Sequence, residues 1–275
     1  MTDFDSRLAF IPGGSTGIGL AIAKRLAARG ADVVLFARRI EPLIRATQEV
    51  RAAGRRESQR VAWRQLDVTD APQVNAVFAD AVAELGAPDI LINCAGRAIP
   101  DYFERISLAQ LDETMRVNFY GCWHAVSALL PHLRDRGGYI VNVSSLAGLI
   151  GVFGYTDYAA SKFAVVGFSE ALRSELAPRG ITVSVLCPPD TQTPGFDREN
   201  ATKPAETHAV SAGASLLSPE AVADALVAGM ARRQFIIIPG RAGRLGYLTK
   251  RVFPRLVDWV MDRQIRTARR ARGEA

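Results

Sequence analysis

The chain has 275 residues, enough for one large domain, and its hydrophobic content of 48% and charged content of 23% are ordinary for a globular protein. Ten Lys or Arg and three Asp or Glu fall within residues 241–275, a net charge of +7, whereas the whole chain carries only +6. Residues 1–240 are therefore close to neutral, which argues against a basic groove through the main body, and no nucleic-acid partner is expected.

The remaining bulk features concern compartment and metal binding. The three cysteines show neither metal-ligand spacing nor a disulfide pattern, no signal-peptide pattern opens the chain, and no run of 18 apolar residues occurs. We therefore expect no metal site and a cytoplasmic protein, one that at most touches a membrane surface peripherally.

Short apolar runs alternate with longer helical patterns along the chain. The predicted strands are 8–11, 32–37, 61–66, 89–93, 139–144, 181–187 and 235–238, and the predicted helices are 18–29, 41–53, 70–85, 107–135, 157–177 and 219–232. This alternation predicts an α/β fold of Rossmann type, a doubly wound parallel sheet of about seven strands with helices on both faces. It forms one domain over residues 1–240, followed by a basic helical tail over 241–275.

Two segments fall outside the alternation. Residues 188–218 contain four prolines and little periodicity, which predicts a long functional connection over a substrate site. In the tail, Pro254 suits the first turn of a helix, after which apolar residues share one face among arginines. Such a basic amphipathic pattern over 244–272 fits contact with an anionic membrane surface, although docking on the domain or on a second subunit fits it equally well.

The glycine-rich stretch "GGSTGIG" joins the first strand to the first helix. Gly13, Gly17 and Gly19 allow the backbone to approach a phosphate, and the helix N-terminus attracts an anion. A tight turn alone would show the same residues, but the position at the first strand-to-helix junction favours a dinucleotide. Arg38 and Arg39 follow the second strand with no acidic residue beside them, which favours NADPH over NADH.

The stretch "SSLAGLIGVFGYTDYAASK" holds the candidate proton-transfer groups. Tyr158 and Lys162 are four residues apart in a helical pattern and share a face, so the ammonium is expected to lower the pKa of the phenol. Tyr155 is farther from Lys162 and is predicted to precede the helix. Ser144 and Ser145 both lie where the preceding strand ends, and the residues alone do not choose between them.

Over residues 8–240 the chain resembles the short-chain dehydrogenase/reductase family. The motifs that carry the resemblance are "GGSTGIG", "LDVTD", "NCAG", "VNFYG", "VNVSS" and "YAASK". In that family the catalytic serine stands thirteen residues before the tyrosine, which selects Ser145. The resemblance implies catalytic roles for Asn118, Ser145, Tyr158 and Lys162, with Asn118 holding a proton-relay water.

The same resemblance implies a set of residues that bind NADPH/NADP+. They are Gly13, Ser15, Thr16, Gly17, Ile18, Gly19, Arg38, Arg39, Asp67, Val68, Asn93, Ala95, Gly96, Tyr158, Lys162, Pro188, Thr191 and Thr193. The chain departs from the family pattern at Pro12 and Pro189, where threonine and glycine are usual. These departures bear on cofactor affinity rather than on the reacting groups.

The segment "PPDTQTPGFDRENATKPAET" resembles the corresponding part of the 3-ketodihydrosphingosine reductases within that family. This likeness implies a lipid-like ketone substrate and the reduction of 3-ketodihydrosphingosine (3-dehydrosphinganine) to dihydrosphingosine (sphinganine) in sphingolipid biosynthesis. The alternatives are another ketone, such as a 3-oxoacyl thioester or a steroid. A homo-oligomer, dimer or tetramer, is expected by resemblance.

Overall fold

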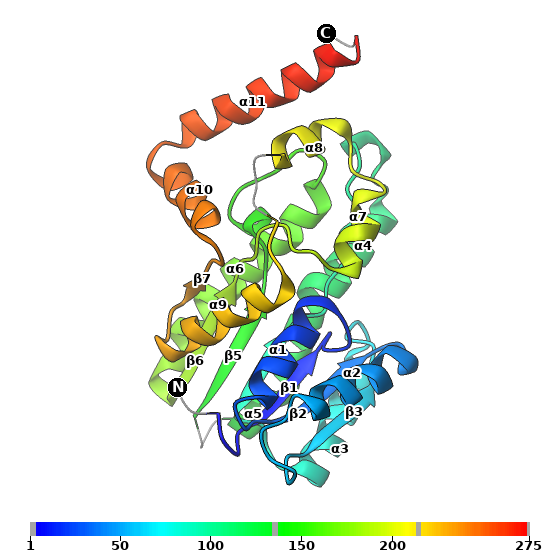
Figure 1. The fold of residues 1–275 in the computed structure, drawn as a ribbon, viewed down its shortest axis with the longest axis vertical. Coiled ribbons are helices and arrows are strands. Elements are labelled where there is room, and N and C mark those ends of the chain that lie inside the picture. The colour runs from blue at the N-terminus through cyan, green and yellow to red at the C-terminus, as the bar shows by residue number, and fades with distance from the viewer. Residues whose placement is uncertain (1–3, 134–136, 213–215, 274–275) are drawn as a thin grey trace.

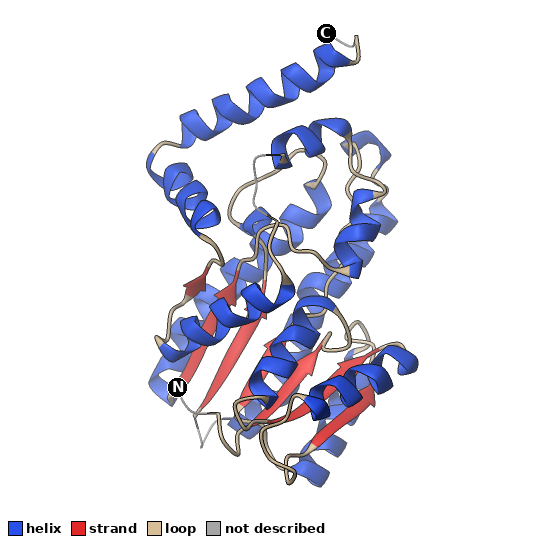
Figure 2. Ribbon diagram, in the orientation of Figure 1, coloured by secondary structure: helices blue, strands red, loops and turns tan. Residues whose placement is uncertain are grey.

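A single parallel sheet forms the centre of the molecule. The computed structural model describes residues 4–133, 137–212 and 216–273. Within these residues seven parallel strands lie in the order β3-β2-β1-β4-β5-β6-β7, which confirms the predicted doubly wound sheet (Figure 2). The strands are β1 (Leu8–Pro12), β2 (Asp32–Ala37), β3 (Val61–Gln65), β4 (Ile90–Asn93), β5 (Gly138–Val143), β6 (Ile181–Leu186) and β7 (Ile236–Ile237).

Helices cover both faces of this sheet (Figure 1). The helices of the described residues are α1 (Gly17–Ala27), α2 (Ile40–Ala52), α3 (Ala71–Leu85), α4 (Leu108–Met115), α5 (Gly121–Leu133), α6 (Thr156–Leu176), α7 (Pro194–Asn200), α8 (Ala205–Ser211), α9 (Pro219–Ala231), α10 (Arg241–Val252) and α11 (Pro254–Ala271). One apolar cluster joins the sheet to α1, α2 and α9, and a second joins it to α3, α5 and α6. Because both faces are covered, the strands are apolar along almost their whole length, as the sequence pattern indicated.

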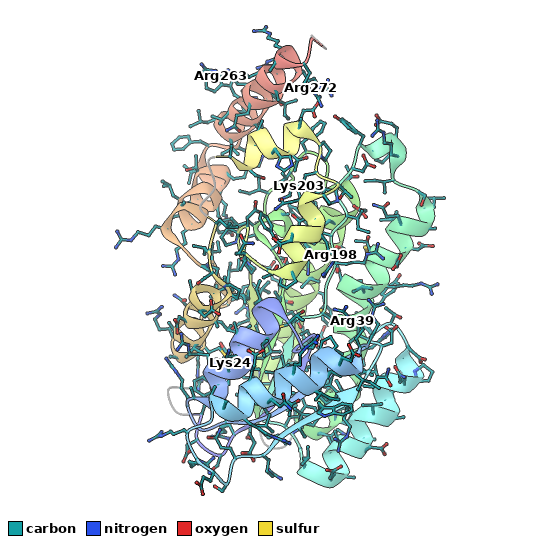
Figure 3. All side chains as sticks on the ribbon, turned by 45° about the vertical axis from the view of Figure 1, so that its right-hand side comes forward. Lys24, Arg39, Arg198, Lys203, Arg263 and Arg272 are labelled. Atoms are coloured by element: carbon teal, nitrogen blue, oxygen red, sulfur yellow. The ribbon has the colours of Figure 1, made fainter. Side chains whose placement is uncertain are left out.

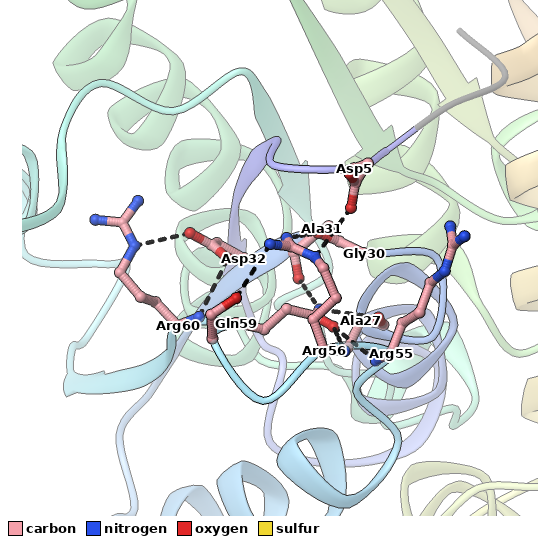
Figure 4. Close-up of polar contacts among 10 residues, drawn as sticks. Asp5, Ala27, Gly30, Ala31, Asp32, Arg55, Arg56, Gln59 and Arg60 are labelled. Atoms are coloured by element: carbon pink, nitrogen blue, oxygen red, sulfur yellow. Dashed lines mark hydrogen bonds and ion pairs between the residues drawn. The ribbon is translucent and has the colours of Figure 1, made fainter.

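A polar cluster ties the start of β3 to the amino-terminal edge of the sheet (Figure 4). The Gln59 amide donates to the carbonyl oxygens of Ala27 and Ala31, at 2.9 and 2.7 Å. The Arg60 guanidinium donates to Asp32 Oδ2 at 2.7 Å. These contacts lie at the amino-terminal ends of the strands, opposite their carboxyl ends. They therefore stabilise the fold without reaching the candidate site.

The predicted helix over 107–135 is interrupted, and its last two positions lie outside the described residues. Helix α4 ends at Met115, and a π-helical turn over Arg116–Tyr120 leads into α5. A π-helical turn adds a residue to the helix and is frequent at functional sites. The continuous apolar periodicity through this region gave no sign of the interruption.

The prediction of an irregular connection over 188–218 is wrong in part, because this segment contains α7 and α8. Each helix has seven residues, too few for a periodic pattern to be recognised. Thr193 begins α7 by accepting a hydrogen bond from the Phe196 N–H at 3.0 Å, and Pro194 occupies its first position. The described residues of this segment, 188–212 and 216–218, thus include two short helices at the carboxyl edge of the sheet.

The tail forms two helices, and α11 begins at Pro254 as expected. Helix α11 crosses above α8, far from the strands (Figure 1). Arg269 and Arg272 reach the Glu206 carboxylate at 3.1 and 2.6 Å, and the Tyr102 hydroxyl donates to the other carboxylate oxygen at 2.9 Å. The Glu206 side chain is 1% exposed, so this ion pair fastens the tail to the 188–218 segment.

None of the described helices combines the length and apolar content needed to span a bilayer.

Candidate active site

The candidate site lies at the carboxyl ends of the central strands. The glycine turn follows β1, Ala95 and Gly96 follow β4, Ser145 follows β5, and Pro188 follows β6. Because all these strands are parallel, their carboxyl ends meet at one edge, where ligands of open α/β sheets bind. The topology thus brings together four motifs that are far apart in the sequence.

Ser145, Tyr158 and Lys162 meet at this edge. Lys162 Nζ lies 5.7 Å from the centre of the Tyr158 ring and donates a hydrogen bond to the Val143 carbonyl oxygen at 2.9 Å. A hydrogen bond from Ser145 to Tyr158 favours the ionised phenol. The predicted shared helix face of Tyr158 and Lys162 agrees with this geometry. The catalytic roles themselves stay predictions.

The expectation that Lys162 lowers the pKa of Tyr158 is wrong for the protein alone. Burial raises the pKa of Tyr158, the Glu199 carboxylate raises it further, and the Ser145 hydrogen bond opposes the rise. Burial also lowers the pKa of Lys162. Desolvation therefore outweighs the attraction between the two groups, and Tyr158 carries its proton at neutral pH.

Asn118 is fully buried in the π-helical turn. Its Oδ1 accepts from the Arg97 N–H at 2.8 Å, and its Nδ2 donates to the Arg97 carbonyl oxygen and to Ser161 Oγ, at 3.0 and 2.9 Å. A methyl group placed on Gly96 would lie 3.4 Å from both Asn118 Oδ1 and Lys162 Nζ. Asn118 and Lys162 therefore flank Gly96 on one side of the site. The side chain of Asn118 thus fixes the loop after β4, and its contact with a proton-relay water stays a prediction.

Ser144 and Tyr155 hold neighbouring parts of the site. Ser144 Oγ donates to the Lys162 carbonyl oxygen at 2.9 Å, which anchors α6 to the end of β5. Tyr155 donates a short hydrogen bond to Glu199 Oε1, and its ring centre lies 5.5 Å from that of Tyr158. Both residues thus lie beside the predicted catalytic groups.

The glycine turn has the shape that a dinucleotide requires. Gly13 has a φ of +80°, and a Cβ there would lie 2.4 Å from the Ala95 backbone nitrogen. A Cβ on Gly19 would lie 2.3 Å from the Gly13 carbonyl oxygen. The N-terminus of α1 follows this turn, and Thr16 at its N-cap makes no side-chain capping bond. Bare backbone and unpaired N–H groups suit a pyrophosphate, so these residues fit NAD(P)(H).

Most of the other predicted cofactor residues lie on this turn, on the loop after β4 and on the 188–218 segment. Ser15, Ile18, Ala95 and Gly96 are at least partly exposed there. Thr193 packs against the turn, since a Cβ on Gly17 would lie 3.1 Å from Thr193 Cγ2. Pro188 accepts from the Leu146 N–H at 2.9 Å, and Thr191 Oγ1 donates to the Pro189 carbonyl oxygen at 2.9 Å. The 188–218 segment therefore reaches both the serine loop and the glycine turn.

Three of the predicted cofactor residues have structural partners as well. Asp67 Oδ1 accepts from the N–H and hydroxyl of Thr69, at 3.0 and 2.8 Å. The Val68 carbonyl oxygen is 2.9 Å from His124 Nδ1. Asn93 Nδ2 donates to Asn142 Oδ1 at 2.8 Å, while its own Oδ1 is buried with no partner among the described residues. The Asn93 side chain thus links β4 to β5.

The end of β2 presents a positive charge. Arg38 and Arg39 are both exposed, and Arg39 is the N-cap residue of α2 (Figure 3). Within the described part of the chain, neither guanidinium forms an ion pair. Two unpaired arginines beside the predicted ribose position are suited to a phosphate dianion.

Sequence reasoning missed a group of charged residues on the 188–218 segment and its neighbours. Glu199 lies next to the tyrosines, Lys203 pairs with Glu199 and Asp190, and Glu206 joins the segment to the tail. Tyr155 and Glu199 are about forty residues apart in the sequence, and no spacing pattern connects them.

A doubly wound sheet with a glycine turn after β1 and a Tyr–Lys pair on α6 is typical of a dinucleotide-dependent oxidoreductase. A model of the family described as "short chain dehydrogenase" matches residues 7–204. The chain therefore belongs to the short-chain dehydrogenase/reductase family, whose members are oxidoreductases that use NAD(P)(H).

Individual relatives agree with this family. The chain is 40% identical to a 3-ketodihydrosphingosine reductase of Bos taurus and 41% identical to a 3-dehydrosphinganine reductase of Danio rerio, over 79% of this chain and 66% of each relative. It thus spans just under two thirds of their length. A fatty acyl-CoA reductase of Acinetobacter baylyi is 33% identical over 93% of this chain and 83% of that protein. A short-chain dehydrogenase/reductase from Burkholderia phymatum in complex with NAD superposes with a TM-score of 0.81 at 27% identity, over 93% of this chain and 96% of that one.

Proposed function

We propose that the protein reduces 3-ketodihydrosphingosine to dihydrosphingosine with NADPH. The likeness to sphingoid ketone reductases at 40–41% identity carries this proposal. Bound NADPH would supply hydride to the ketone carbon. Ser145 and Tyr158 hydrogen-bond the carbonyl oxygen, Tyr158 gives it a proton, and Lys162 holds the nicotinamide ribose. Because Tyr158 is protonated at neutral pH, it is ready to act as the acid.

The experiment measures NADPH consumption by the purified protein with 3-ketodihydrosphingosine and, in parallel, with a 3-oxoacyl thioester. Faster turnover of the sphingoid ketone is expected.

The second candidate is reduction of an acyl thioester or its 3-oxo derivative, and the similarity to a fatty acyl-CoA reductase over 93% of the chain favours it. Turnover of the thioester alone would support this second function and refute the first.

NADPH is proposed over NADH because of Arg38 and Arg39, although the structural relative from Burkholderia phymatum was crystallised with NAD. Replacing both arginines with alanine removes two charge-assisted contacts, each worth about 1.5–3 kcal/mol. We expect kcat/KM for NADPH to fall at least about 100-fold and kcat/KM for NADH to stay nearly unchanged. The replacement of Arg45, an exposed arginine of α2, by alanine is the control. Equal losses with both cofactors would contradict the assignment.

We also propose that the tail rests on an anionic membrane surface. Exposed apolar side chains on α10 and at the start of α11 lie beside arginines; they are Leu245, Leu248, Val252, Phe253 and Leu256. The double variant Leu248→Glu/Phe253→Glu should lose flotation with phosphatidylglycerol vesicles, whereas Leu108→Glu, at an 81% exposed position on α4, should keep it. Equal flotation of the two variants would refute the proposal. The expected homo-oligomer stays a prediction.

A further inference from the structure

Glu199 is the carboxylate with the largest electrostatic effect on Tyr158, the predicted proton donor. It accepts the hydroxyl proton of Tyr155, whose ring centre lies 5.5 Å from that of Tyr158. Among charged groups, it also makes the largest contribution to the raised pKa of Tyr158. Glu199 therefore lies beside the Tyr155–Tyr158 pair, and Tyr158 is the residue whose hydroxyl is predicted to meet the substrate carbonyl oxygen.

The charges around Glu199 are not balanced by the nearest cation. Lys203 Nζ lies 3.1 Å from Glu199 Oε1 and 3.6 Å from Asp190 Oδ2, so one ammonium serves two carboxylates. The Lys203 side chain is 1% exposed, whereas those of Glu199 and Asp190 are 17% and 31% exposed. The lysine therefore lies on the enclosed side of the carboxylates, and their other side stays accessible.

Glu199 keeps an oxygen atom for a further partner. Tyr155 and Lys203 both contact Oε1, and the described residues form no hydrogen bond with Oε2. Figure 3 shows Lys203 and Arg198 on the segment between the sheet and α11, the part of the molecule that covers the candidate site. A cationic group of a ligand can therefore approach Glu199 without displacing either existing contact.

The proposed substrate carries such a group in the required place. In 3-ketodihydrosphingosine the amine is attached to the carbon next to the carbonyl carbon, and it is a cation when protonated. When the carbonyl oxygen meets the Tyr158 hydroxyl, the amine must lie directly beside that contact. A 3-oxoacyl thioester or a steroid has no cation at this point.

We propose that Glu199, assisted by Asp190, binds the protonated amine and thereby selects 2-amino ketones over ketones that lack the amine. This inference rests on the proposed function, and it names the feature of the substrate that the 188–218 segment recognises. Binding of the amine also supplies positive charge beside Tyr158, which offsets the effect of the two carboxylates on its proton.

The test compares two ketones of equal chain length, 3-ketodihydrosphingosine and 1-hydroxyoctadecan-3-one, which differs only in lacking the amine. Glu199→Gln keeps an oxygen that can accept from Tyr155 but removes the charge. We expect the ratio of kcat/KM for the amino ketone to kcat/KM for its amine-free analogue to fall about 10- to 100-fold. Asp197→Asn is the control on the same helix and should leave the ratio unchanged, since among the described residues the Asp197 side chain accepts a hydrogen bond from Gln192 alone, at 3.0 Å.

A ratio that Glu199→Gln leaves unchanged, with both rates lowered equally, would overturn the inference. If Glu199→Gln does not fold, Asp190→Asn carries the same test, with a smaller fall in the ratio expected. A second readout is the pH profile of dihydrosphingosine oxidation, which should move to lower pH in Glu199→Gln because a group that raises the pKa of Tyr158 is gone. An unmoved profile would count against the inference.

Failure of the proposed function has a different signature. A wild-type protein that reduces neither ketone would refute the sphingoid substrate. In that case a shorter 2-amino ketone and its amine-free analogue are compared. A preference for the amino ketone that Glu199→Gln abolishes would preserve the role of Glu199, and the absence of any preference would refute it.

Discussion

Replacing Tyr158 with phenylalanine should lower kcat for ketone reduction by about 10²- to 10⁴-fold, the usual contribution of a positioned general acid. The change removes one oxygen atom beside Ser145 and leaves the ring and its contact with Lys162 in place. NADPH binding, measured by quenching of protein fluorescence, should therefore stay within a few-fold of wild type. Tyr120→Phe is the matched control and should keep wild-type kcat, because Tyr120 is 47% exposed and lies outside the Ser145, Tyr158 and Lys162 group.

The raised pKa of Tyr158 adds a pH dependence to this result. The group stays protonated through neutral pH, so reduction should keep its rate there and decline only as the pH passes that raised pKa. Alcohol oxidation needs the phenolate, so its rate should climb with pH over the alkaline range. A Tyr158→Phe variant with near wild-type kcat, or an oxidation rate independent of pH, would contradict the assignment of Tyr158.

Replacing Gly19 with alanine should raise the Kd for NADPH by about 5- to 150-fold. The added Cβ would lie 2.3 Å from the Gly13 carbonyl oxygen and 3.1 Å from Gly14 Cα, so the turn must open. Both neighbours are backbone atoms, and forcing extra atoms into such a contact costs about 1–3 kcal/mol even when the structure relaxes. The measurement is NADPH affinity by calorimetry, together with the melting temperature.

Gly167→Ala is the control for this substitution. Gly167 lies within α6, and a Cβ there would meet no atom within 4 Å. The variant should bind NADPH normally and gain up to about 1 kcal/mol of stability, because alanine favours the helix. Wild-type affinity in Gly19→Ala would show that the turn does not contact the cofactor.

The order of strands and helices could be read from the sequence with small errors at the ends. Strand β2 lies at residues 32–37, as predicted, because its apolar run is bounded by polar residues on both sides. The helices of 188–218 were missed, since each is too short to repeat an apolar period. The π-helical turn at Asn118 was also missed, because it changes the hydrogen bonding of the backbone and not the pattern of side chains.

Local spacing determined the parts of the site that lie on one element. The glycine turn is a single strand-to-helix junction, and Tyr158 and Lys162 share one helix face, so a few residues specify each arrangement. Family resemblance then distinguished Ser145 from Ser144, which the residues alone did not. These features depend on backbone geometry within one or two turns of chain.

Only the tertiary structure showed which charges surround these groups. It placed Glu199 beside Tyr155, paired Lys203 with two carboxylates, and joined Glu206 to Arg269 and Arg272 of the tail. It also reversed the expected direction of the Tyr158 pKa, because burial and a carboxylate from another element outweigh the lysine one turn away. Sequence spacing reports neighbours along a helix, whereas desolvation and charge depend on every element that packs around the group.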